Sequence, residues 1–329
     1  MDDFFTRLCA ELALGTPLAP PRPLQGGYTH RMVALTTTQG RYAVKLLNPE
    51  IMQRPDALEN YRRAGRYEAL LEEAGLPILP ALTLKGRKLH SIGGQYVFVF
   101  DYFDGKVLPE DAVTPVHCVA MGDVLARIHR FCRADAPVSE SHDIDWDSLA
   151  ADLLRDSECR AEGALLRHHL PLLKQLTRAA AEAVPLLQGR QALCHNDMDP
   201  KNVLWQGSRF RIIDLECLGP GDPGQELLDL ALSWAGTPPD KARFTAFVQG
   251  YMQAGGTLPE QAAAVYDSRR NMLDWLAYNA RRCLFDDPRE RATGREQVAA
   301  ALEKLLADRQ SRPQVLAWLA ECAGANAGA

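Results

Sequence analysis

Four polar side chains near the middle of the chain have the types and spacing needed to move a phosphoryl group. They are His195, Asp197, Asn202 and Asp214. Asp197 could orient a substrate hydroxyl and accept its proton during the transfer. Asn202 and Asp214 offer the amide and carboxylate oxygens that magnesium prefers, and magnesium neutralises the terminal phosphates of a nucleotide. The pattern predicts a catalytic aspartate beside a two-ligand metal site, with His195 orienting the loop.

The residues between the two predicted metal ligands indicate how those ligands come together. Residues 203–205 and 210–213 are rich in β-forming side chains, and a turn at 206–208 separates them. A hairpin here would carry Asn202 at one end and Asp214 at the other. Because His-x-Asp-x4-Asn alone arises by chance in some chains, the hairpin and the second acid are what make the prediction specific.

A second group of residues upstream predicts a nucleotide-binding sheet. Gly26 and Gly27 precede a strand expected over residues 31–38, and glycines let backbone N–H groups approach phosphates closely. The next strand, expected over 41–47, contains Lys45, and side-chain alternation places this lysine on the inner face, where it could reach the α and β phosphates. The plainer alternatives are a lysine that extends to water and two glycines that only make a turn.

Taken together, these motifs resemble the aminoglycoside phosphotransferase and choline kinase family of protein-kinase-like small-molecule kinases. The resemblance covers most of the chain and rests on Tyr-Ala-Val-Lys at 42–45, His-Asn-Asp…Asn at 195–202, Ile-Asp-Leu-Glu at 213–216 and Gly-Asp-Pro at 221–223. Asn196 and Glu216 resemble the choline kinase branch more than the protein kinases, which carry Arg and Gly there. No Ala-Pro-Glu signature follows Asp214.

The resemblance implies an α+β, bilobal, protein-kinase-like fold. Residues 1–103 would form the N-terminal lobe with a small antiparallel sheet, and residues 104–329 the larger, mainly helical C-terminal lobe with the catalytic loop, the metal site and the substrate cleft. ATP would be the phosphoryl donor and Mg²⁺ the metal. Backbone groups at Asp101 and Phe103, where the chain crosses between the lobes, would hold adenine.

A glutamate partner for Lys45 is also implied, because protein kinases pair their strand lysine with a helix glutamate. Glu68, in a helix expected over 57–74, is the candidate. The position usual in the family falls nearer residues 64–65, so the pairing is either shifted by a turn or absent, and a solvated helix acid is the alternative.

The acceptor site is less specific in the sequence. Its candidates are Asp199, Glu216, Asp274, Trp275 and Tyr278. An aromatic pair with an acid could hold a cationic substrate, although core packing is the commoner role for two aromatics on one helix face. Arg281 and Arg282 could instead clamp a carboxylate or phosphate. In the catalytic loop, Lys201 stands where the family has a small residue, and Lys201 and Asp199 either contact substrate or face water.

Periodicity and turn residues predict the elements that position these groups. Strands are expected near residues 24, 32 and 42 and over 79–90 and 95–103. Helices are expected after residue 106 over 114–132, 145–155, 163–186, 224–235, 239–254, 258–284 and 293–323.

Composition sets the remaining bounds. The 329 residues are 47% hydrophobic, which is enough for a substantial core. The formal charge of −5 does not indicate binding to nucleic acid or to a membrane surface. Residues 1–14 are expected to form an amphipathic helix rather than a signal peptide, and no apolar run approaches the ~20 residues of a membrane span. The eight cysteines show no Cys-x-x-Cys pair, so we expect reduced thiols in a cytoplasmic protein.

The sequence therefore predicts an ATP- and magnesium-dependent phosphotransferase, monomeric or homodimeric, that phosphorylates a hydroxyl of a small molecule. An aminoglycoside or other antibiotic, a choline-like amino alcohol, homoserine and sugars all stay open as acceptors. A protein Ser/Thr kinase is one alternative, disfavoured by the missing activation signature. A nucleotide-binding pseudokinase scaffold is another, disfavoured because Lys45, Asp197, Asn202 and Asp214 are all present.

Overall fold

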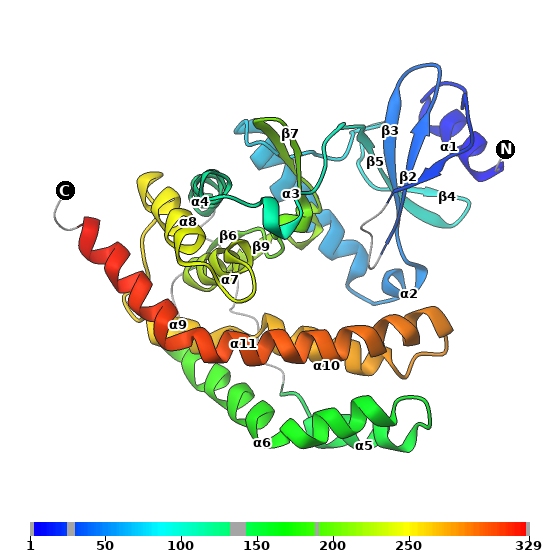
Figure 1. Cartoon of the computed structure of the whole chain (residues 1–329). Helices are drawn as coiled ribbons and strands as arrows, with labels where there is room; N and C mark the ends of the chain where they lie inside the picture. The colour runs from blue at the N-terminus through cyan, green and yellow to red at the C-terminus, as the bar shows by residue number, and fades with distance from the viewer. Residues whose placement is uncertain (1–2, 25–29, 132–142, 188–190, 327–329) are drawn as a thin grey trace. The chain divides into compact units, whose positions relative to one another are not determined.

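The chain folds into two compact units in a computed structural model that describes residues 3–24, 30–131, 143–187 and 191–326 (Figure 1). The first unit comprises Met1–Val113 and Leu193–Gly219, and the second comprises Thr114–Ala192 and Pro220–Ala329. The expected α+β composition is confirmed, because the first unit holds a small antiparallel sheet and the second is helical.

Residues Leu193–Gly219, here called the catalytic segment, group with the N-terminal elements. Backbone hydrogen bonds explain this grouping. Ile212 accepts from the N–H of Leu79 and donates to the carbonyl of Pro77, both at 2.8 Å. Lys106 and Trp205 exchange two further backbone bonds of 2.8 Å. The segment is therefore tied to chain that precedes Val113.

The sheet of the first unit has the strand order β1-β2-β3-β5-β4, and its neighbouring strands pair antiparallel. The strands are β1 (Arg22–Pro23), β2 (Arg31–Thr36), β3 (Arg41–Leu46), β4 (His90–Ile92) and β5 (Gln95–Asp101). Helix α1 (Asp3–Leu12) packs its apolar side chains, including Phe5 and Leu8, against sheet residues such as Val33, Val44 and Val97. This core holds β3, and with it Lys45, in place.

One predicted strand of the first unit is wrong. Residues 79–90 form isolated bridges at Ala81 and Leu84 rather than a strand, and regular pairing begins only at His90. The reason is a turn in which Lys85 and Gly86 both have positive φ, 49° and 76°, which no extended strand can accommodate. Helices α2 (Pro49–Met52) and α3 (Ala57–Glu73) and the short η1 (Glu110–Ala112) complete the N-terminal part.

The catalytic segment is made of short elements. They are β6 (Ala192–Cys194), η3 (Pro200–Asn202), β7 (Val203–Gln206), β8 (Arg209–Ile212), η4 (Leu215–Cys217) and β9 (Gly219–Gly221), with β6–β9 and β7–β8 as two-stranded sheets.

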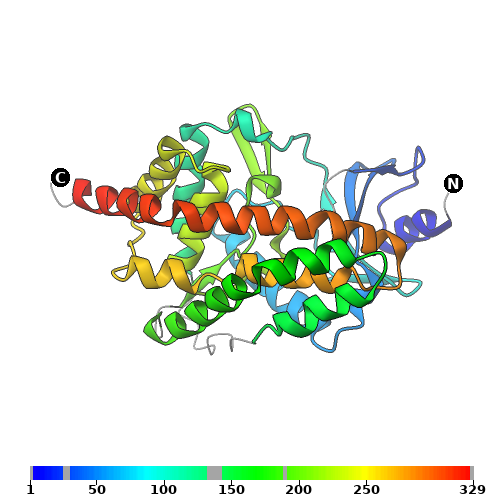
Figure 2. The ribbon, with the colours of Figure 1, turned by 60° about the horizontal axis from the view of Figure 1, so that its bottom comes forward.

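The second unit is built from the helices that the sequence predicts after residue 106. They are α4 (Pro115–His129), α5 (Trp146–Arg155), α6 (Arg160–Ala183), α7 (Pro223–Ala235), α8 (Lys241–Gln253), α9 (Ala262–Ser268), α10 (Asn271–Arg282) and α11 (Pro288–Asn326), with a short η2 (Val184–Leu187). α5, α6, α10 and α11 lie side by side around one apolar core (Figure 2). Glycines allow α4 and α8 to approach closely, since a Cβ on Gly122 would lie 2.1 Å from the carbonyl oxygen of Phe247. In the described part of the chain, no helix has the length and apolar character needed to cross a bilayer.

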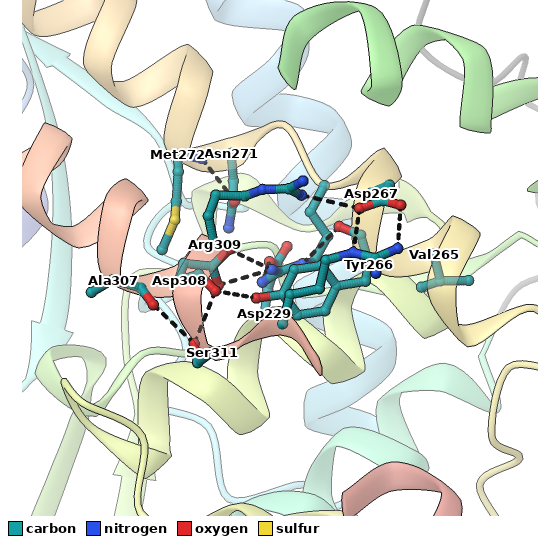
Figure 3. A network of polar contacts seen from close by, with 12 residues as sticks. Asp229, Val265, Tyr266, Asp267, Asn271, Met272, Ala307, Asp308, Arg309 and Ser311 are labelled. Atoms are coloured by element: carbon teal, nitrogen blue, oxygen red, sulfur yellow. Dashed lines mark hydrogen bonds and ion pairs between the residues drawn. The ribbon is translucent and has the colours of Figure 1, made fainter. Parts of the chain in front are cut away.

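The single helix predicted over residues 258–284 is wrong, because the chain breaks between α9 and α10. Arg269 is extended there (φ −66°, ψ 120°), and its guanidinium contacts acids of α7 and α11. Figure 3 shows the polar network at this point, with Asp229 of α7, Tyr266 of α9 and Asp308 of α11. Arg269 donates to Asp229 at 3.0 Å and to both carboxylate oxygens of Asp308 at 2.9 Å. Tyr266 donates its hydroxyl to the Asp308 carbonyl at 2.7 Å. Tertiary ion pairing overrides helix periodicity at this point.

Replacing Arg269 with lysine is expected to lower the free energy of unfolding by about 2 kcal/mol, because an ammonium cannot reproduce the forked contact that joins two aspartates. Urea unfolding would measure the loss. The matched control is Arg291→Lys, since Arg291 also contacts both oxygens of one carboxylate, that of Asp156, but in a more exposed position. Equal losses in the two variants would contradict a special role for the buried site.

Candidate active site

The predicted hairpin forms and brings the two predicted metal ligands together. β7 and β8 pair antiparallel with Val203 opposite Ile212, and Gly207 takes the positive φ (61°) that the tight turn requires. The next backbone bond runs from the N–H of Ile213 to the carbonyl of Asn202 at 2.9 Å. Asn202 and Asp214 therefore lie at the same end of the hairpin, as the sequence predicts.

Asn202 holds Asp197 through its amide nitrogen. Its Nδ2 donates to the Asp197 carbonyl and to Asp197 Oδ2, both at 2.8 Å. Because both contacts use the NH₂ group, the amide oxygen of Asn202 is left to act as a ligand for a hard cation. One side chain thus links the predicted base to the predicted metal site.

His195 lies fully buried beneath the same loop. Its Nδ1 accepts the backbone N–H of Asp197 at 3.3 Å, which fixes the direction in which the loop leaves β6. Asn196 adopts a left-handed conformation (φ 64°), which asparagine tolerates better than most residues, and donates its side-chain amide to the Cys217 carbonyl at 2.8 Å. These contacts explain why the residue between His195 and Asp197 is an asparagine.

Lys201 forms an ion pair with the predicted base, which the sequence leaves open. Its Nζ lies 2.8 Å from Asp197 Oδ1 and 3.4 Å from Asp199 Oδ2. Burial raises the pKa of Asp197 and the nearby charge of Asp199 acts in the same direction, while the positive charge of Lys201 opposes both. Asp199, a predicted substrate contact, forms an ion pair with this lysine.

Lys45 is buried, as strand alternation predicts, and it contacts two acids from the far end of the catalytic segment. Its Nζ forms ion pairs with Asp214 and with Glu216. Burial acts to raise the pKa of both carboxyls; the charge of Lys45 nevertheless holds the pKa of Asp214 below its usual range, whereas the pKa of Glu216 is raised by burial and by the neighbouring Asp214. Two carboxyls face one ammonium here, and a divalent cation bound to them would favour the ionised form of both.

His30 and Tyr61 line this acidic cluster. His30 Nδ1 accepts the N–H of Asn48 at 3.1 Å, and its Nε2 lies 3.0 Å from the Tyr61 hydroxyl and 3.6 Å from Glu216. The pKa of His30 is lowered from 6.5 to about 4, mainly by burial and also by the charge of Lys45, while the charge of Asp214 opposes the change. His30 is therefore neutral at neutral pH.

This lowered pKa predicts a pH dependence of stability. The unfolded chain binds a proton on His30 below pH 6.5, but the folded chain does so only below about pH 4, so the free energy of unfolding falls as the pH is lowered through this window. The shift corresponds to about 3 kcal/mol. In His30→Gln, urea unfolding between pH 7 and 4 should be less pH-dependent than in the wild type by this amount. His168→Gln, on the exposed face of α6, is the control and should keep the wild-type slope.

Glu68 is not the partner of Lys45, which corrects the prediction. Its carboxylate binds Lys88 at 2.6 Å and accepts the N–H of Ala81 at 2.9 Å. The physical reason is that Lys88 and the loop at Ala81 surround this turn of α3, so Glu68 is already satisfied. The second contact of Lys45 is Glu216 instead, an acid that the sequence suggests for the acceptor site.

Two other predicted nucleotide contacts, Asp101 and Phe103, lie at the C-terminal end of β5 and just after it. Asp101 ends β5 and is exposed, and Phe103 is half-buried with the guanidinium of Arg211 5.8 Å above its ring. Gly26 and Gly27 lie outside the described residues.

The remaining acceptor candidates lie on α10 of the second unit. Trp275 is 37% exposed and stacks on Tyr278 with ring centroids 5.8 Å apart. Asp274 is exposed and pairs with Arg270 at 3.3 Å. Arg282 is not available as a clamp for an anion, because it is 2% exposed and donates to Glu290 at 2.5 Å. Of the predicted arginine pair, only Arg281 lies on an exposed face.

The Gly-Asp-Pro motif has a structural role in the second unit. Asp222 caps α7 by accepting the N–H of Gln225 at 2.8 Å, with Pro223 in the first turn. Within that helix, Glu226 binds His129 at 2.8 Å, and His129 also contacts the Tyr251 hydroxyl at 2.8 Å. These buried contacts give His129 and Glu226 a structural role.

Three contacts of the site were missed by sequence reasoning: Lys201 with Asp197, Glu216 with Lys45, and the His30–Tyr61 pair. The Lys201–Asp197 pair could have been predicted, because an aspartate and a lysine four residues apart in one loop can form an ion pair. The other two contacts join residues far apart in the chain, and no local pattern predicts them.

A small antiparallel sheet with an inward lysine, followed by this loop and hairpin and by a helical second unit, defines a protein-kinase-like small-molecule phosphotransferase. The chain belongs to the phosphotransferase enzyme family, whose model matches residues 21–265. This confirms the resemblance drawn from the motifs. No curated protein matches the sequence significantly.

Solved structures share the fold at low sequence identity. A spectinomycin phosphotransferase in complex with ADP and spectinomycin has a TM-score of 0.72 at 13% identity, covering 93% of this chain and 98% of that one. An amicoumacin kinase in complex with AMP-PNP, Ca²⁺ and Ami has a TM-score of 0.61 at 15% identity, with 94% of both chains covered. A choline/ethanolamine kinase family protein from Mesorhizobium loti has a TM-score of 0.58 at 18% identity, covering 96% and 99%.

Proposed function

We propose that this protein transfers the γ-phosphoryl group of ATP to a hydroxyl of a small molecule in a magnesium-dependent reaction. The observation that carries the proposal is a continuous set of contacts within the first unit. Lys45 binds Asp214, the hairpin joins Asp214 to Asn202, and Asn202 holds Asp197. Three separate stretches of sequence thus supply a phosphate-binding cation, two hard oxygen ligands and a proton acceptor to one place.

Each residue of the site has its own role in this proposal. Asp197 orients the acceptor hydroxyl and takes its proton, and His195 and Asn202 hold the loop that carries it. Asn202 and Asp214 fit a magnesium ion, which when bound neutralises the phosphates of the donor. Lys45 binds those phosphates, while the backbone near Asp101, Phe103, Gly26 and Gly27 holds the rest of the nucleotide. The division into a nucleotide lobe, residues 1–103, and an acceptor lobe, residues 104–329, is part of this proposal.

For the acceptor we propose a cationic molecule, either an aminated antibiotic or a choline-like amino alcohol. The support is the stack of the exposed Trp275 on the half-buried Tyr278, with Asp274 beside it, a combination that attracts a positive charge. The burial of Arg282 against Glu290 removes half of the arginine pair that would have favoured an anion. The names of the similar solved structures, which include an antibiotic phosphotransferase and a choline/ethanolamine kinase family protein, agree with this class.

The test is ADP formation from Mg-ATP with a panel of acceptors: aminoglycosides, spectinomycin, choline, ethanolamine, homoserine, sugars, a peptide pool and water alone. We expect at least one cationic acceptor to raise the rate about tenfold or more over water, and EDTA to abolish it. Reaction only with peptides would favour the protein kinase alternative. ATP binding without ADP formation for any acceptor would favour the pseudokinase scaffold.

A further inference from the structure

The two oxygens of the Asp197 carboxylate are held by different groups. Oδ2 accepts from the neutral amide of Asn202, and Oδ1 accepts from the ammonium of Lys201, both at 2.8 Å. Lys201 also reaches Asp199 at 3.4 Å. A positive charge therefore lies one hydrogen bond away from the oxygen of the predicted base.

Lys201 is not needed to hold Asp197 in place. Asn202 already binds both the backbone carbonyl and the side chain of Asp197. The Lys201 side chain is 49% exposed, and ion pairs this open to water contribute less than about 1 kcal/mol to stability. A purely structural role therefore explains little of this arrangement.

The ammonium of Lys201 also has a third N–H group that neither Asp197 nor Asp199 uses. A protonated lysine carries three N–H groups, and the structure gives Nζ two partners among the described residues, Asp197 and Asp199. Two accepting oxygens use two of these N–H groups and leave the third for another acceptor. Lys201 can therefore contact a further anionic oxygen without releasing the first two.

The reaction provides such an oxygen next to Asp197. A proton acceptor must lie within hydrogen-bond distance of the attacking hydroxyl, and that hydroxyl lies in line with the phosphorus. The negative charge of the transferred group is spread over its three equatorial oxygens. A cation bonded to the proton acceptor thus lies beside these oxygens at the moment of transfer.

We infer that Lys201 is a further catalytic residue, which donates its third N–H to an equatorial oxygen of the phosphoryl group in flight. The inference rests on the proposed function, since it takes Asp197 as the base. The acceptor oxygen forms a bond to phosphorus, the bond from phosphorus to the bridging oxygen breaks, and its electron pair leaves with ADP. The hydroxyl proton goes to Asp197, and Lys201 stays protonated throughout.

The test compares Lys201→Met with the wild-type chain in Mg-ATP turnover, using water and the best acceptor of the panel. We expect kcat to fall about 100-fold with either acceptor, the size of effect seen when one preorganised donor to a transition state is removed, while KM for ATP changes less than about threefold. Lys201→Arg should recover to within about tenfold. The matched control is Lys241→Met, since Lys241 pairs with Glu321 at 2.7 Å and is 52% exposed, and it should keep wild-type rates.

A second measurement does not depend on turnover. Binding of Mg-ADP with aluminium fluoride, which imitates the planar phosphoryl group, should be about 30-fold weaker in Lys201→Met, while binding of Mg-ADP alone is unchanged. Unchanged kcat together with unchanged fluoride-complex binding in Lys201→Met would overturn this inference and leave the proposed function standing. A rise in acceptor KM with normal ATP hydrolysis in water would also overturn it, by making Lys201 an acceptor contact. A wild-type chain that neither binds nor hydrolyses ATP would overturn the proposed function and this inference with it.

Discussion

Replacing Asp197 with alanine is expected to lower kcat by about 10³-fold and to leave ATP binding within a few-fold of wild type. In the proposed mechanism the loss follows from the role of the Asp197 carboxylate as the acceptor of the hydroxyl proton. Nucleotide binding should persist because the proposed function assigns it to Lys45 and Asp214, which form an ion pair with one another. Asp197→Asn should behave in the same way, because an amide keeps the shape but cannot take the proton.

The measurements are steady-state ADP formation and ATP affinity by calorimetry on the same preparations. Asp152→Asn is the control, since Asp152 pairs with Arg155 three residues away at 2.7 Å, an acid–base pair on the exposed face of α5. It should retain wild-type kcat and affinity. If Asp197→Ala loses ATP binding in parallel with kcat, Asp197 acts in nucleotide binding and the assignment of the base is wrong.

The parts of this site that could be predicted from the sequence are those that depend on near neighbours. The hairpin that carries Asn202 and Asp214 follows from two short β-rich runs and a turn, and its register confirms the prediction. The burial of Lys45 follows from alternation along one strand. In both cases the relevant contacts lie within a few residues, so local patterns contain enough information.

The parts that could not be predicted depend on which distant segments meet. Lys45 and Glu216 are 171 residues apart, and nothing in either segment says that this acid, rather than Glu68, will meet the lysine. Glu68 binds Lys88 instead, which lies 20 residues later, after a stretch without a regular strand. The break at Arg269 has the same origin, because its partners Asp229 and Asp308 come from other helices and override the helical period. The tertiary structure determines which partner a charged residue binds, and the sequence around that residue does not predict it.

Replacing Lys45 with methionine is expected to have two effects that separate its roles. ATP affinity should fall at least tenfold, because the phosphates lose their buried cation. In the absence of metal, the free energy of unfolding should also fall by about 4 kcal/mol at pH 7, because Asp214 and Glu216 are left side by side in a buried site without a counter-charge.

Magnesium should then restore more stability to this variant than it adds to the wild type, because the two carboxylates and the amide oxygen of Asn202 can bind the ion once the ammonium is gone. Thermal unfolding with and without Mg²⁺ measures this difference. The matched control is Lys88→Met, which removes a second partly buried lysine from Glu68 and Glu72 in the same unit. It should lose stability but keep ATP affinity, and it should gain less from Mg²⁺ because Glu72 is exposed to solvent. Equal Mg²⁺ stabilisation in Lys45→Met and the wild type would contradict a cation site at Asp214, since a lysine that competes with a metal for the same carboxylates must weaken the metal's binding.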